Sequence, residues 1–366
     1  MKCNWKECTL GDLITFQRGH DLPKSQMING KYPVVGSNGI IGYHNEYTTE
    51  APSITIGRSG NVGNPYIVYG RTWSHNTTLY VKDFKGNDPV FVYYFLKTMD
   101  LANYAGGSAV PTLNRNHIHT LPIEVPESVG VQKKIGYYLR LFDEKIELNN
   151  EINNNLLQQL HILYSRLFCD SAMDTPLGEV VATTSGGTPS RKHDEYYSDS
   201  SICWVKSKEL LGNYIHETEE HINDLAIKKS SAKLLPKHSV LIAMYGATVG
   251  ACGVISKPMT CNQAVCALLC NENYPYTYLF QIAYESQQKF INLAVGSAQQ
   301  NISQVLIKQL NLHSDLNIIQ KFHGLALPMH QEIESLQAEN MHLAALRDNL
   351  LPKLMSGELD VSNIEL

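Results

Sequence analysis

The second half of this 366-residue chain repeats the landmarks of its first half in the same order. Leu10-Gly11-Asp12 returns as Leu177-Gly178-Glu179, and each tripeptide opens a short β-type run that is followed by a glycine-bearing turn. The apolar run and glycine turn that end at Gly63 return as a run and turn that end at Gly250. Because a single core stops growing near about 250–300 residues, a repeat of this length predicts two similar domains.

Later landmarks show where the two halves differ. A proline at Pro89 and at Pro275 starts a predicted buried helix in each half. The offset between equivalent residues is 167 at Leu10 and 187 at Val62, and it then stays between 186 and 189. The 20 extra residues of the second half (187 minus 167) lie in a polar segment, which we expect to form loops on the shared scaffold. This segment spans residues 191–237, and the remaining matched segments are residues 107–113 with 296–302 and residues 121–123 with 310–312.

Each half ends in a helical pattern with a 4-3 apolar spacing, which is typical of a packed helix pair. Two such patterns in register within one chain predict two long helices that pack against each other as a coiled coil. A helix that packs only against its own domain is the alternative. The predicted seam and partner-docking positions are Ile146, Asn153, Leu156, Leu160, Leu163, Ile333, Leu336, Asn340, Leu343 and Leu350.

Proline chemistry predicts an interruption in each of these helices. A proline inside a helix costs about 3 kcal/mol, so we expect Pro328 to start a long helix after a short one. The repeat then places a similar break near residues 140–143. Asn153 and Asn340 occupy equivalent seam positions, where a buried amide fixes the register of a coiled coil. Solvated helix ends are the alternative for both asparagines.

No familiar catalytic motif is present. The chain has no G-x-x-x-x-G-K-[ST] phosphate loop, no G-x-G-x-x-G after a strand, and no H-E-x-x-H or G-x-S-x-G sequence. The eight cysteines form no C-x-x-C pair, which predicts buried reduced thiols. His117 and His119 would share one face of a strand, but no third ligand is evident nearby, so no metal site is predicted.

Two further sequences resemble catalytic motifs only superficially. Residues 88–91 and 273–276 each differ by one residue from the D/N-P-P-Y/F loop of amino-methyltransferases, but their prolines already have a helix-starting role. Asp143-Glu144-Lys145 suggests a nuclease carboxylate-lysine pair, yet it fits a helix beginning better, where acidic side chains stabilise the helix dipole. The sequence therefore predicts a non-catalytic chain.

Charge and hydropathy restrict the cellular setting. The formal net charge of −5 argues against indiscriminate binding of polyanions, but it permits a local basic face. The N-terminus carries charge where a secretion signal needs an apolar run, and no stretch approaches the roughly 20 apolar residues of a membrane span. We expect a soluble cytoplasmic chain that makes no contact with a membrane.

Basic and amide side chains gather on the predicted glycine turns of both halves. Arginine, asparagine and glutamine suit bidentate contacts to base edges, whereas lysine mostly holds phosphates. A solvated surface residue is the alternative for each one, so the hypothesis depends on the set. The candidates in the first half are Arg18, Lys24, Arg58, Ser59, His75, Asn76 and Arg115. Those in the second half are Thr188, Ser190, Arg191, Lys192, Lys206, Lys208, Tyr245, Asn262, Gln263, Gln299 and Gln300.

Two segments of the sequence carry a resemblance to a known family. They are residues 346–359 (Leu-Arg-Asp-Asn-Leu-Leu-Pro-Lys-Leu-Met-Ser-Gly-Glu-Leu) and residues 32–42 (Tyr-Pro-Val-Val-Gly-Ser-Asn-Gly-Ile-Ile-Gly). The first resembles the closing motif of the DNA specificity subunits of type I restriction-modification systems, and the second is similar to a segment common in the target-recognition domains of that family. The resemblance covers essentially the whole chain, and the closing motif is its most specific part.

The resemblance implies an α+β architecture of two similar mixed α/β target-recognition domains separated by two conserved helical spacers, which are long antiparallel coiled-coil helices. On this basis residues 1–128 and 171–315 are the recognition domains, and residues 129–170 and 316–366 are the spacers. The family implies that each domain reads half of a split asymmetric site in double-stranded DNA. The helices would dock two methyltransferase subunits, and restriction (nuclease/translocase) subunits would complete the complex. S-adenosylmethionine, ATP and Mg are then expected in the partner subunits and not in this chain.

Two other functions remain open at this stage. The chain is alternatively the recognition subunit of another methyltransferase-nuclease system, which a neighbouring gene fused to catalytic motifs would indicate. It is also alternatively a protein-binding scaffold without a DNA role, which competition by duplex DNA would exclude.

Overall fold

The computed structural model describes residues 4–106, 111–294 and 301–364, and the chain forms two compact units. Unit 1 consists of Met1–Glu147 and His342–Leu366, and unit 2 of Leu148–Met341. Two long helices, α4 (Val129–Leu167) and α10 (Leu316–Met355), each pass from one unit into the other. Every unit therefore contains one end of α4 and one end of α10.

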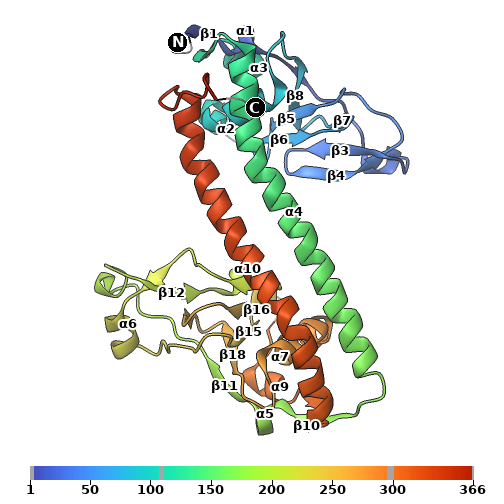
Figure 1. The fold of residues 1–366 in the computed structure, drawn as a ribbon, viewed down its shortest axis with the longest axis vertical. Coiled ribbons are helices and arrows are strands. Elements are labelled where there is room, and N and C mark those ends of the chain that lie inside the picture. Colours follow the sequence, from blue (N-terminus) through green and yellow to red (C-terminus); the bar gives the residue numbers. More distant parts are fainter. Residues whose placement is uncertain (1–3, 107–110, 295–300, 365–366) are drawn as a thin grey trace. The chain divides into compact units, whose positions relative to one another are not determined.

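Unit 1 is built on three small sheets, of which the largest has the strand order β2-β8-β5-β6 and is antiparallel (Figure 1). The second has the order β4-β3-β7 with a parallel β3-β7 pair, and the third pairs β1 with β9. The strands are β1 (Trp5–Thr9), β2 (Thr15–Arg18), β3 (Tyr32–Gly36), β4 (Gly39–His44), β5 (Ser53–Gly57), β6 (Pro65–Val68), β7 (Trp73–Ser74), β8 (Thr78–Asp83) and β9 (Pro122–Pro126). The short helices and turns are α1 (Leu10–Leu13), η1 (Lys24–Gln26), α2 (Pro89–Thr98), η2 (Leu101–Tyr104) and α3 (Arg115–His119).

Unit 2 repeats this plan and adds one strand to the main sheet, whose order is β11-β18-β15-β16-β13. Its smaller sheets have the order β14-β12-β17, again with one parallel pair, and β10-β19. The strands are β10 (Met173–Pro176), β11 (Ala182–Ser185), β12 (Ile202–Val205), β13 (Tyr214–Ile215), β14 (His221–Ile222), β15 (Val240–Ala243), β16 (Cys252–Ile255), β17 (Thr260–Cys261), β18 (Val265–Leu269) and β19 (Asn311–His313). The helices and turns are α5 (Leu177–Val180), η3 (Asp194–Tyr196), η4 (Ser207–Glu209), α6 (Asp224–Lys229), η5 (Gly246–Thr248), α7 (Tyr276–Glu285), α8 (Gln287–Leu293) and α9 (Gln304–Lys308).

Equivalent backbone hydrogen bonds confirm the repeat. Leu10 N donates to Leu121 O at 2.9 Å, and Leu177 N donates to Leu310 O at 2.8 Å. The glycine turns after β5 and β15 also have the same geometry, because Gly63 and Gly250 both have a φ of +80°. The mixed α/β fold with two similar domains, predicted from the sequence, is therefore confirmed.

The segment 191–237 is more ordered than expected. We predicted loops there, but the segment contains β12, β13, β14, α6 and two short turns. Buried side chains explain the difference, since Trp204, Ile222 and Ala226 form a small apolar cluster of their own. The prediction of loops alone was wrong because a few apolar residues in a polar segment were sufficient to fold it.

The two long helices are antiparallel and uninterrupted (Figure 1). Within unit 2, the Asn149 amide donates to Asn340 Oδ1 at 2.8 Å, while Tyr164, further along α4, lies against Phe322, earlier in α10, at 5.9 Å between ring centroids. Contacts that advance along one helix and recede along the other define an antiparallel pair. The predicted break at residues 140–143 is wrong, because Arg140 continues the helix with ion pairs to Glu144 and Glu147 on the same α4 surface.

Pro328 lies inside α10, so the predicted helix start at this residue is also wrong. Proline removes the N–H that would reach the carbonyl of Gly324. Gly324 and Pro328 are both exposed, so water can bind that carbonyl. On the opposite face Phe322, Ala326 and Ile333 are buried in the core of unit 2. Packing of this apolar face outweighs the local cost of the proline.

Two smaller predictions are also corrected. His117 and His119 belong to helix α3 and not to a strand, because Asn114 caps a helical turn by accepting a hydrogen bond from Asn116 N. Asp143 lies in the middle of α4, where it accepts hydrogen bonds from the hydroxyl of Tyr94 and from Arg347. It therefore anchors α2 and α10 to α4 rather than starting a helix.

The closing segment of the chain packs into unit 1. Leu354 and Met355 are buried in the same core as Ile135 and Leu139 of α4. Gly357 has a φ of +72°, and a Cβ atom at this position would meet the ring of Trp5 at 2.7 Å, so only glycine fits there. Within the described ranges, every helix is too short or too polar to serve as a transmembrane span.

Candidate functional site

The main surface cavity of unit 1 brings together three of the predicted arginines. Arg18, Arg58 and Arg115 line an open cavity of about 900 Å³. Arg58 is half-buried and the other two are exposed, and none of the three guanidinium groups forms an ion pair with a described residue. The cavity therefore carries three positive charges that no described acidic side chain neutralises.

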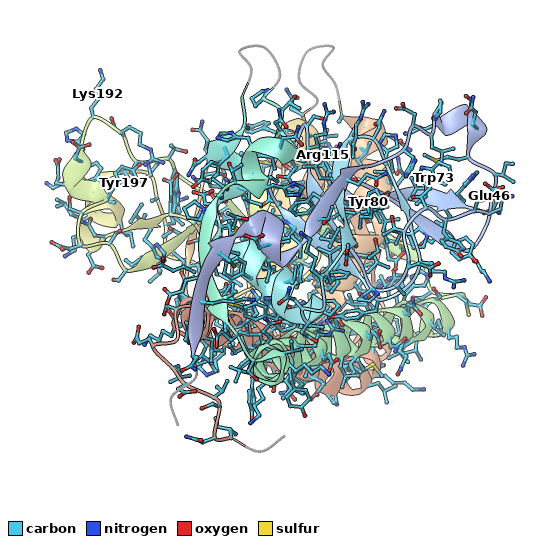
Figure 2. All side chains as sticks on the ribbon, turned by 90° about the horizontal axis from the view of Figure 1, so that it is seen from above. Glu46, Trp73, Tyr80, Arg115, Lys192 and Tyr197 are labelled. Atoms are coloured by element: carbon cyan, nitrogen blue, oxygen red, sulfur yellow. The ribbon has the colours of Figure 1, made fainter. Side chains whose placement is uncertain are left out.

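Separate segments of the chain deliver these arginines to one place. Arg18 ends β2, Arg58 follows β5, and Arg115 is the first residue of α3. The segments are joined by backbone hydrogen bonds, since Arg58 N donates to Thr77 O at 2.8 Å and Leu113 N donates to Arg58 O at 2.9 Å. Figure 2 shows the Arg115 side chain at the surface of the unit. The glycine turn after β5 and the start of α3 thus hold the charges on fixed backbone.

The cavity also contains residues that the sequence analysis did not select. Asn103, Tyr104, Asn114 and His117 line it beside the arginines. The Tyr104 and His117 rings meet edge to face at 6.1 Å between centroids. His117 had been considered only as a metal ligand, whereas the structure gives it a place among basic and amide groups. The sequence could have indicated this place for His117, because it lies two residues after Arg115 on the same short helix.

The other candidates of unit 1 lie on neighbouring turns rather than in the cavity lining. Ser59 bridges to Thr112, which does line the cavity. His75 Nδ1 lies 3.1 Å from the Thr77 hydroxyl, and Asn76 donates to Asp21. Lys24 is exposed in the separate turn η1. The structure therefore groups Arg18, Arg58, Ser59 and Arg115, and it leaves Lys24 apart.

The equivalent cavity positions in unit 2 are neutral. Ser185 ends β11 as Arg18 ends β2, Met244 O accepts from Ile302 N as Arg58 O accepts from Leu113 N, and Gln304 opens α9 as Arg115 opens α3. Gln304 donates to the Thr183 hydroxyl at 2.7 Å and accepts from the Ser185 hydroxyl at 3.3 Å. Met244 is buried. The same backbone therefore presents hydroxyl and amide groups where unit 1 presents guanidinium groups.

The basic candidates of unit 2 lie instead in segment 191–237, and most are paired with glutamates. Glu220 binds both Arg191 and Lys206, and Glu219 binds Lys208. The hydrogen bond from Lys206 lowers the pKa of Glu220 below its usual value. Burial opposes this shift, and the hydrogen bond from Arg191 adds to it. Only Lys192, which projects from its loop in Figure 2, has no ion pair with a described residue.

Aromatic rings support these paired cations. The Arg191 guanidinium lies 4.3 Å from the ring centroid of Tyr197 and 5.4 Å from that of Trp204. The Lys206 ammonium also lies 5.7 Å from the Trp204 ring. A cation held by a glutamate and two rings is largely satisfied by the protein, so it has less to gain from a phosphate than a free arginine has.

The remaining candidates of unit 2 are neutral groups on loops. Asn262 and Gln263 occupy the loop that corresponds to His75 and Asn76, and Asn262 Oδ1 accepts from Ala264 N at 3.1 Å. The Thr188 hydroxyl faces Gln263 N at 3.5 Å, so these side chains are neighbours. The other members of the set are Ser190, whose hydroxyl accepts from Lys192 N at 3.3 Å, exposed Tyr245, which bridges to Asn301, and Gln299 and Gln300, which lie outside the described residues.

The predicted helix seam follows the pattern of burial. Leu160 and Ile333 are fully buried together in the core of unit 2, and Leu336 is also buried. Asn340 exchanges hydrogen bonds with Asn149 and Asn150, whereas the amide of Asn153 is buried without a hydrogen-bond partner among the described residues. The remaining seam positions are half-buried, namely Ile146, Leu156, Leu163, Leu343 and Leu350.

Comparison with protein families gives a match to both halves of the chain. The family described as "Type I restriction modification DNA specificity domain" matches residues 2–158 and 172–314. The MjaIX specificity subunit of a type I restriction enzyme from Methanocaldococcus jannaschii is 26% identical over an alignment of 311 residues, which covers 75% of this chain and 70% of the relative. A putative type I specificity subunit from Mycoplasma pneumoniae is 24% identical and is covered, like this chain, over 96% of its length.

A solved structure has the same fold. The type I restriction-modification S subunit from M. genitalium aligns with a TM-score of 0.63 at 17% identity and covers 96% of each chain. At this identity the likeness concerns the fold alone. The twofold match in sequence and the repeated scaffold in the structure agree with each other.

Proposed function

The chain belongs to the family of type I restriction-modification DNA specificity subunits, and from this premise we propose that each unit reads one half of a bipartite, asymmetric site in double-stranded DNA. The observation that carries the proposal is the repeated scaffold with unlike side chains at equivalent loop positions. Arg18, Arg58 and Arg115 in unit 1 correspond to neutral groups in unit 2. One backbone used twice with different hydrogen-bonding groups fits two different half-sites.

The cavity of unit 1 has the chemistry of a DNA contact. A guanidinium group binds the O6 and N7 atoms of guanine or the oxygens of a phosphate with two parallel hydrogen bonds. Because the three arginines form no ion pair with a described residue, binding to DNA would not require them to give up such an ion pair. The amide of Asn114 and the ring of His117 add neutral hydrogen-bonding groups at the same place. Unit 2 would read its half-site mainly with the neutral loop groups around Asn262, Gln263 and Gln304.

We place the chemistry of the complex in other subunits. The chain has no phosphate-binding loop and no catalytic motif, so methyl transfer with S-adenosylmethionine and ATP- and Mg-dependent cleavage would belong to methyltransferase and restriction subunits. The purified chain alone should therefore neither methylate nor cleave DNA nor hydrolyse ATP. Activity of the isolated chain, free of contaminants, would contradict this division of labour.

The long helices would dock the methyltransferase subunits and set the spacing of the half-sites. Leu160 is fully buried, so a charged residue there would unfold unit 2 and would not test docking. Tyr137 and Leu141 are better targets, since both are exposed and lie one turn apart on α4 within unit 1. Tyr137→Glu with Leu141→Glu should prevent co-purification of methyltransferase subunits and leave the chain folded. Tyr284→Glu, an exposed residue of α7, is the matched control.

Methylome sequencing tests the reading function directly. Cells that carry the gene and its partner subunits should show one split methylated sequence that is absent without the gene. Exchange of residues 1–128 for the equivalent domain of another specificity subunit should change one half of that sequence and leave the other half unchanged. A change in both halves, or no gene-dependent methylation by an assembled complex, would contradict the proposal.

A further inference from the structure

We propose that unit 2 carries a zinc site formed by Cys203, Glu217 and His221. All three residues lie in the segment 191–237, which contains the extra residues of the second half. Cys203 and His221 lie on β12 and β14, which correspond to β3 and β4 of unit 1, and the register places Pro33 and Tyr43 at the equivalent positions. Unit 1 therefore has no thiol or imidazole at these two positions.

The ligand atoms already converge. Cys203 and His221 face each other as partners in the antiparallel register of β12 and β14. The Glu217 Oε1 atom lies 2.9 Å from Cys203 Sγ and 2.6 Å from His221 Nε2. All three ligand atoms lie within 4.8 Å of one another. Two of the ligands are thus fixed by a β-ladder, and the third comes from the loop that leads into β14.

The donor set matches the preference of zinc. A thiolate, an imidazole nitrogen and a carboxylate oxygen are its usual protein ligands, and water completes a tetrahedron where the protein supplies three. Bond lengths of about 2.0–2.3 Å place tetrahedral ligand atoms about 3.4–3.6 Å apart, so the shell must widen by less than about 1 Å. Glu217 can provide this movement, because about half of its side chain is exposed.

Lys257 occupies the position of a cation at this site. Its ammonium lies 3.1 Å from Glu217 Oε2, whereas His221 Nε2 contacts Oε1, and the lysine side chain is half-exposed. When Zn²⁺ binds, the Cys203 thiol releases its proton to solvent and the Lys257 ammonium moves into water. The positive charge of Zn²⁺ thus replaces that of the Lys257 ammonium beside Glu217, and no further reactant is needed.

Metal binding would rigidify the acidic segment that holds the basic candidates of unit 2. Glu217 and His221 stand on either side of Glu219 and Glu220, which bind Lys208, Arg191 and Lys206. One metal ion bound by residues at both ends of this segment would fix those ion pairs in place. This consequence rests on the proposed DNA-reading function, whereas the metal site itself does not.

Cobalt absorption tests the site on the purified full-length chain. Co²⁺ bound to a thiolate gives a sulfur-to-metal charge-transfer band in the near ultraviolet, which a hydrogen-bonded cluster does not give. We expect one equivalent of Co²⁺ to produce this band and one equivalent of Zn²⁺ to remove it. Cys203→Ser should abolish the band. Cys169→Ser is the matched control, because Cys169 is an exposed thiol of the same unit, contrary to the prediction that the cysteines are buried.

A second variant separates a metal site from a structural hydrogen-bond network. Lys257→Met keeps every ligand and removes the competing ammonium, so zinc affinity measured against a chromophoric chelator should rise by about tenfold, because the repulsion between two like charges is removed. The proposal is overturned if Lys257→Met weakens zinc binding or leaves it unchanged, if folded Cys203→Ser keeps the band, or if Cys169→Ser loses it. Should Cys203→Ser fail to fold, the Lys257→Met titration decides alone.

Discussion

The positions that line the cavity of unit 1 and the equivalent positions of unit 2 share backbone hydrogen bonds but differ in charge. Unit 1 places three arginines without described ion pairs around one cavity. Unit 2 places the neutral residues Ser185, Met244 and Gln304 at the equivalent positions, and its basic candidates lie in segment 191–237, where Glu219 and Glu220 neutralise most of them. The difference teaches that the repeat preserves the geometry of the loops and not their charge. Under the proposed function, the two DNA half-sites would be bound through different forces, and the local positive charge of unit 1 would allow a chain of net charge −5 to bind DNA.

The largest expected effect comes from removal of the unit 1 charges. Each arginine that contacts DNA contributes about 1–3 kcal/mol, so Arg58→Met with Arg115→Met should weaken binding of the cognate duplex by about 2–6 kcal/mol. Methionine keeps an unbranched apolar stem close to that of arginine and removes the charge and its hydrogen bonds. Fluorescence anisotropy with the assembled complex at fixed salt measures the loss.

The control for this pair is a substitution at the equivalent position of unit 2. Gln304→Met should cost about 1 kcal/mol, because it removes neutral hydrogen bonds only. Equal losses of binding free energy in the two variants would show that the difference in charge between the equivalent positions does not affect DNA binding.

The next effect concerns a buried histidine of unit 2. The equivalent residue of unit 1 is Asp143, which is bound to Arg347. In unit 2 it is His330, which is fully buried with its Nδ1 atom 3.0 Å from the Tyr214 hydroxyl. Burial, with smaller contributions from His323 and His238, lowers the pKa of His330 from 6.5 to about 3. Unfolding restores the ordinary pKa, so between these values the unfolded chain binds a proton that the folded chain does not. Stability from this residue is complete above pH 6.5 and falls as the pH decreases.

Acidification from pH 7 to pH 5 should therefore cost unit 2 about 2 kcal/mol through His330. Pulse proteolysis in urea, followed through fragments of unit 2, measures the change in the free energy of unfolding. His330→Gln should make that free energy less dependent on pH, and His342→Gln, at an exposed position of α10, should not. An unchanged pH dependence in His330→Gln would show that this histidine is not the source.

The smallest effect is a gain. Ser185→Arg with Gln304→Arg would rebuild two of the three unit 1 charges on the unit 2 scaffold. Each new phosphate contact should steepen the dependence of binding on salt by about 0.9 and improve affinity for any duplex by about 1 kcal/mol. Gln331→Arg with Ala338→Arg adds the same charge on exposed positions of α10 and serves as the control. The two double variants should differ in salt slope, and identical slopes would mean that only total charge matters.

Local patterns in the sequence predicted the repeated units well and tertiary pairings poorly. The glycine turns at Gly63 and Gly250 and the helix-starting Pro89 were predictable, because backbone conformation at these residues depends on a few neighbours. The continuous helix through Pro328 was not, since burial of Phe322 and Ile333 outweighed the local rule. Long-range packing decides such cases.

The candidate site shows the same limit. Arg18, Arg58 and Arg115 were each selected from the sequence, but their meeting in one cavity depends on long-range pairings. Strand β8 pairs with both β2 and β5, and Leu113 N, just before α3, donates to Arg58 O. The pairing of Arg191 and Lys206 with Glu220 joins residues that are far apart in the chain, so no local spacing indicated that these cations are neutralised. The sequence therefore located the basic residues and did not show which of them are free to bind DNA.

The salt dependence of binding tests the central claim most directly. Two triple variants of the assembled complex remove the same number of charges: Arg18, Arg58 and Arg115 to Met in unit 1, and Arg191, Lys206 and Lys208 to Met in unit 2. The slope of log affinity against log salt on the cognate duplex should fall by about 2–3 in the first variant and by less than about 1 in the second. Equal decreases, or a larger decrease in the second variant, would contradict the account that free arginines in unit 1 carry the electrostatic grip.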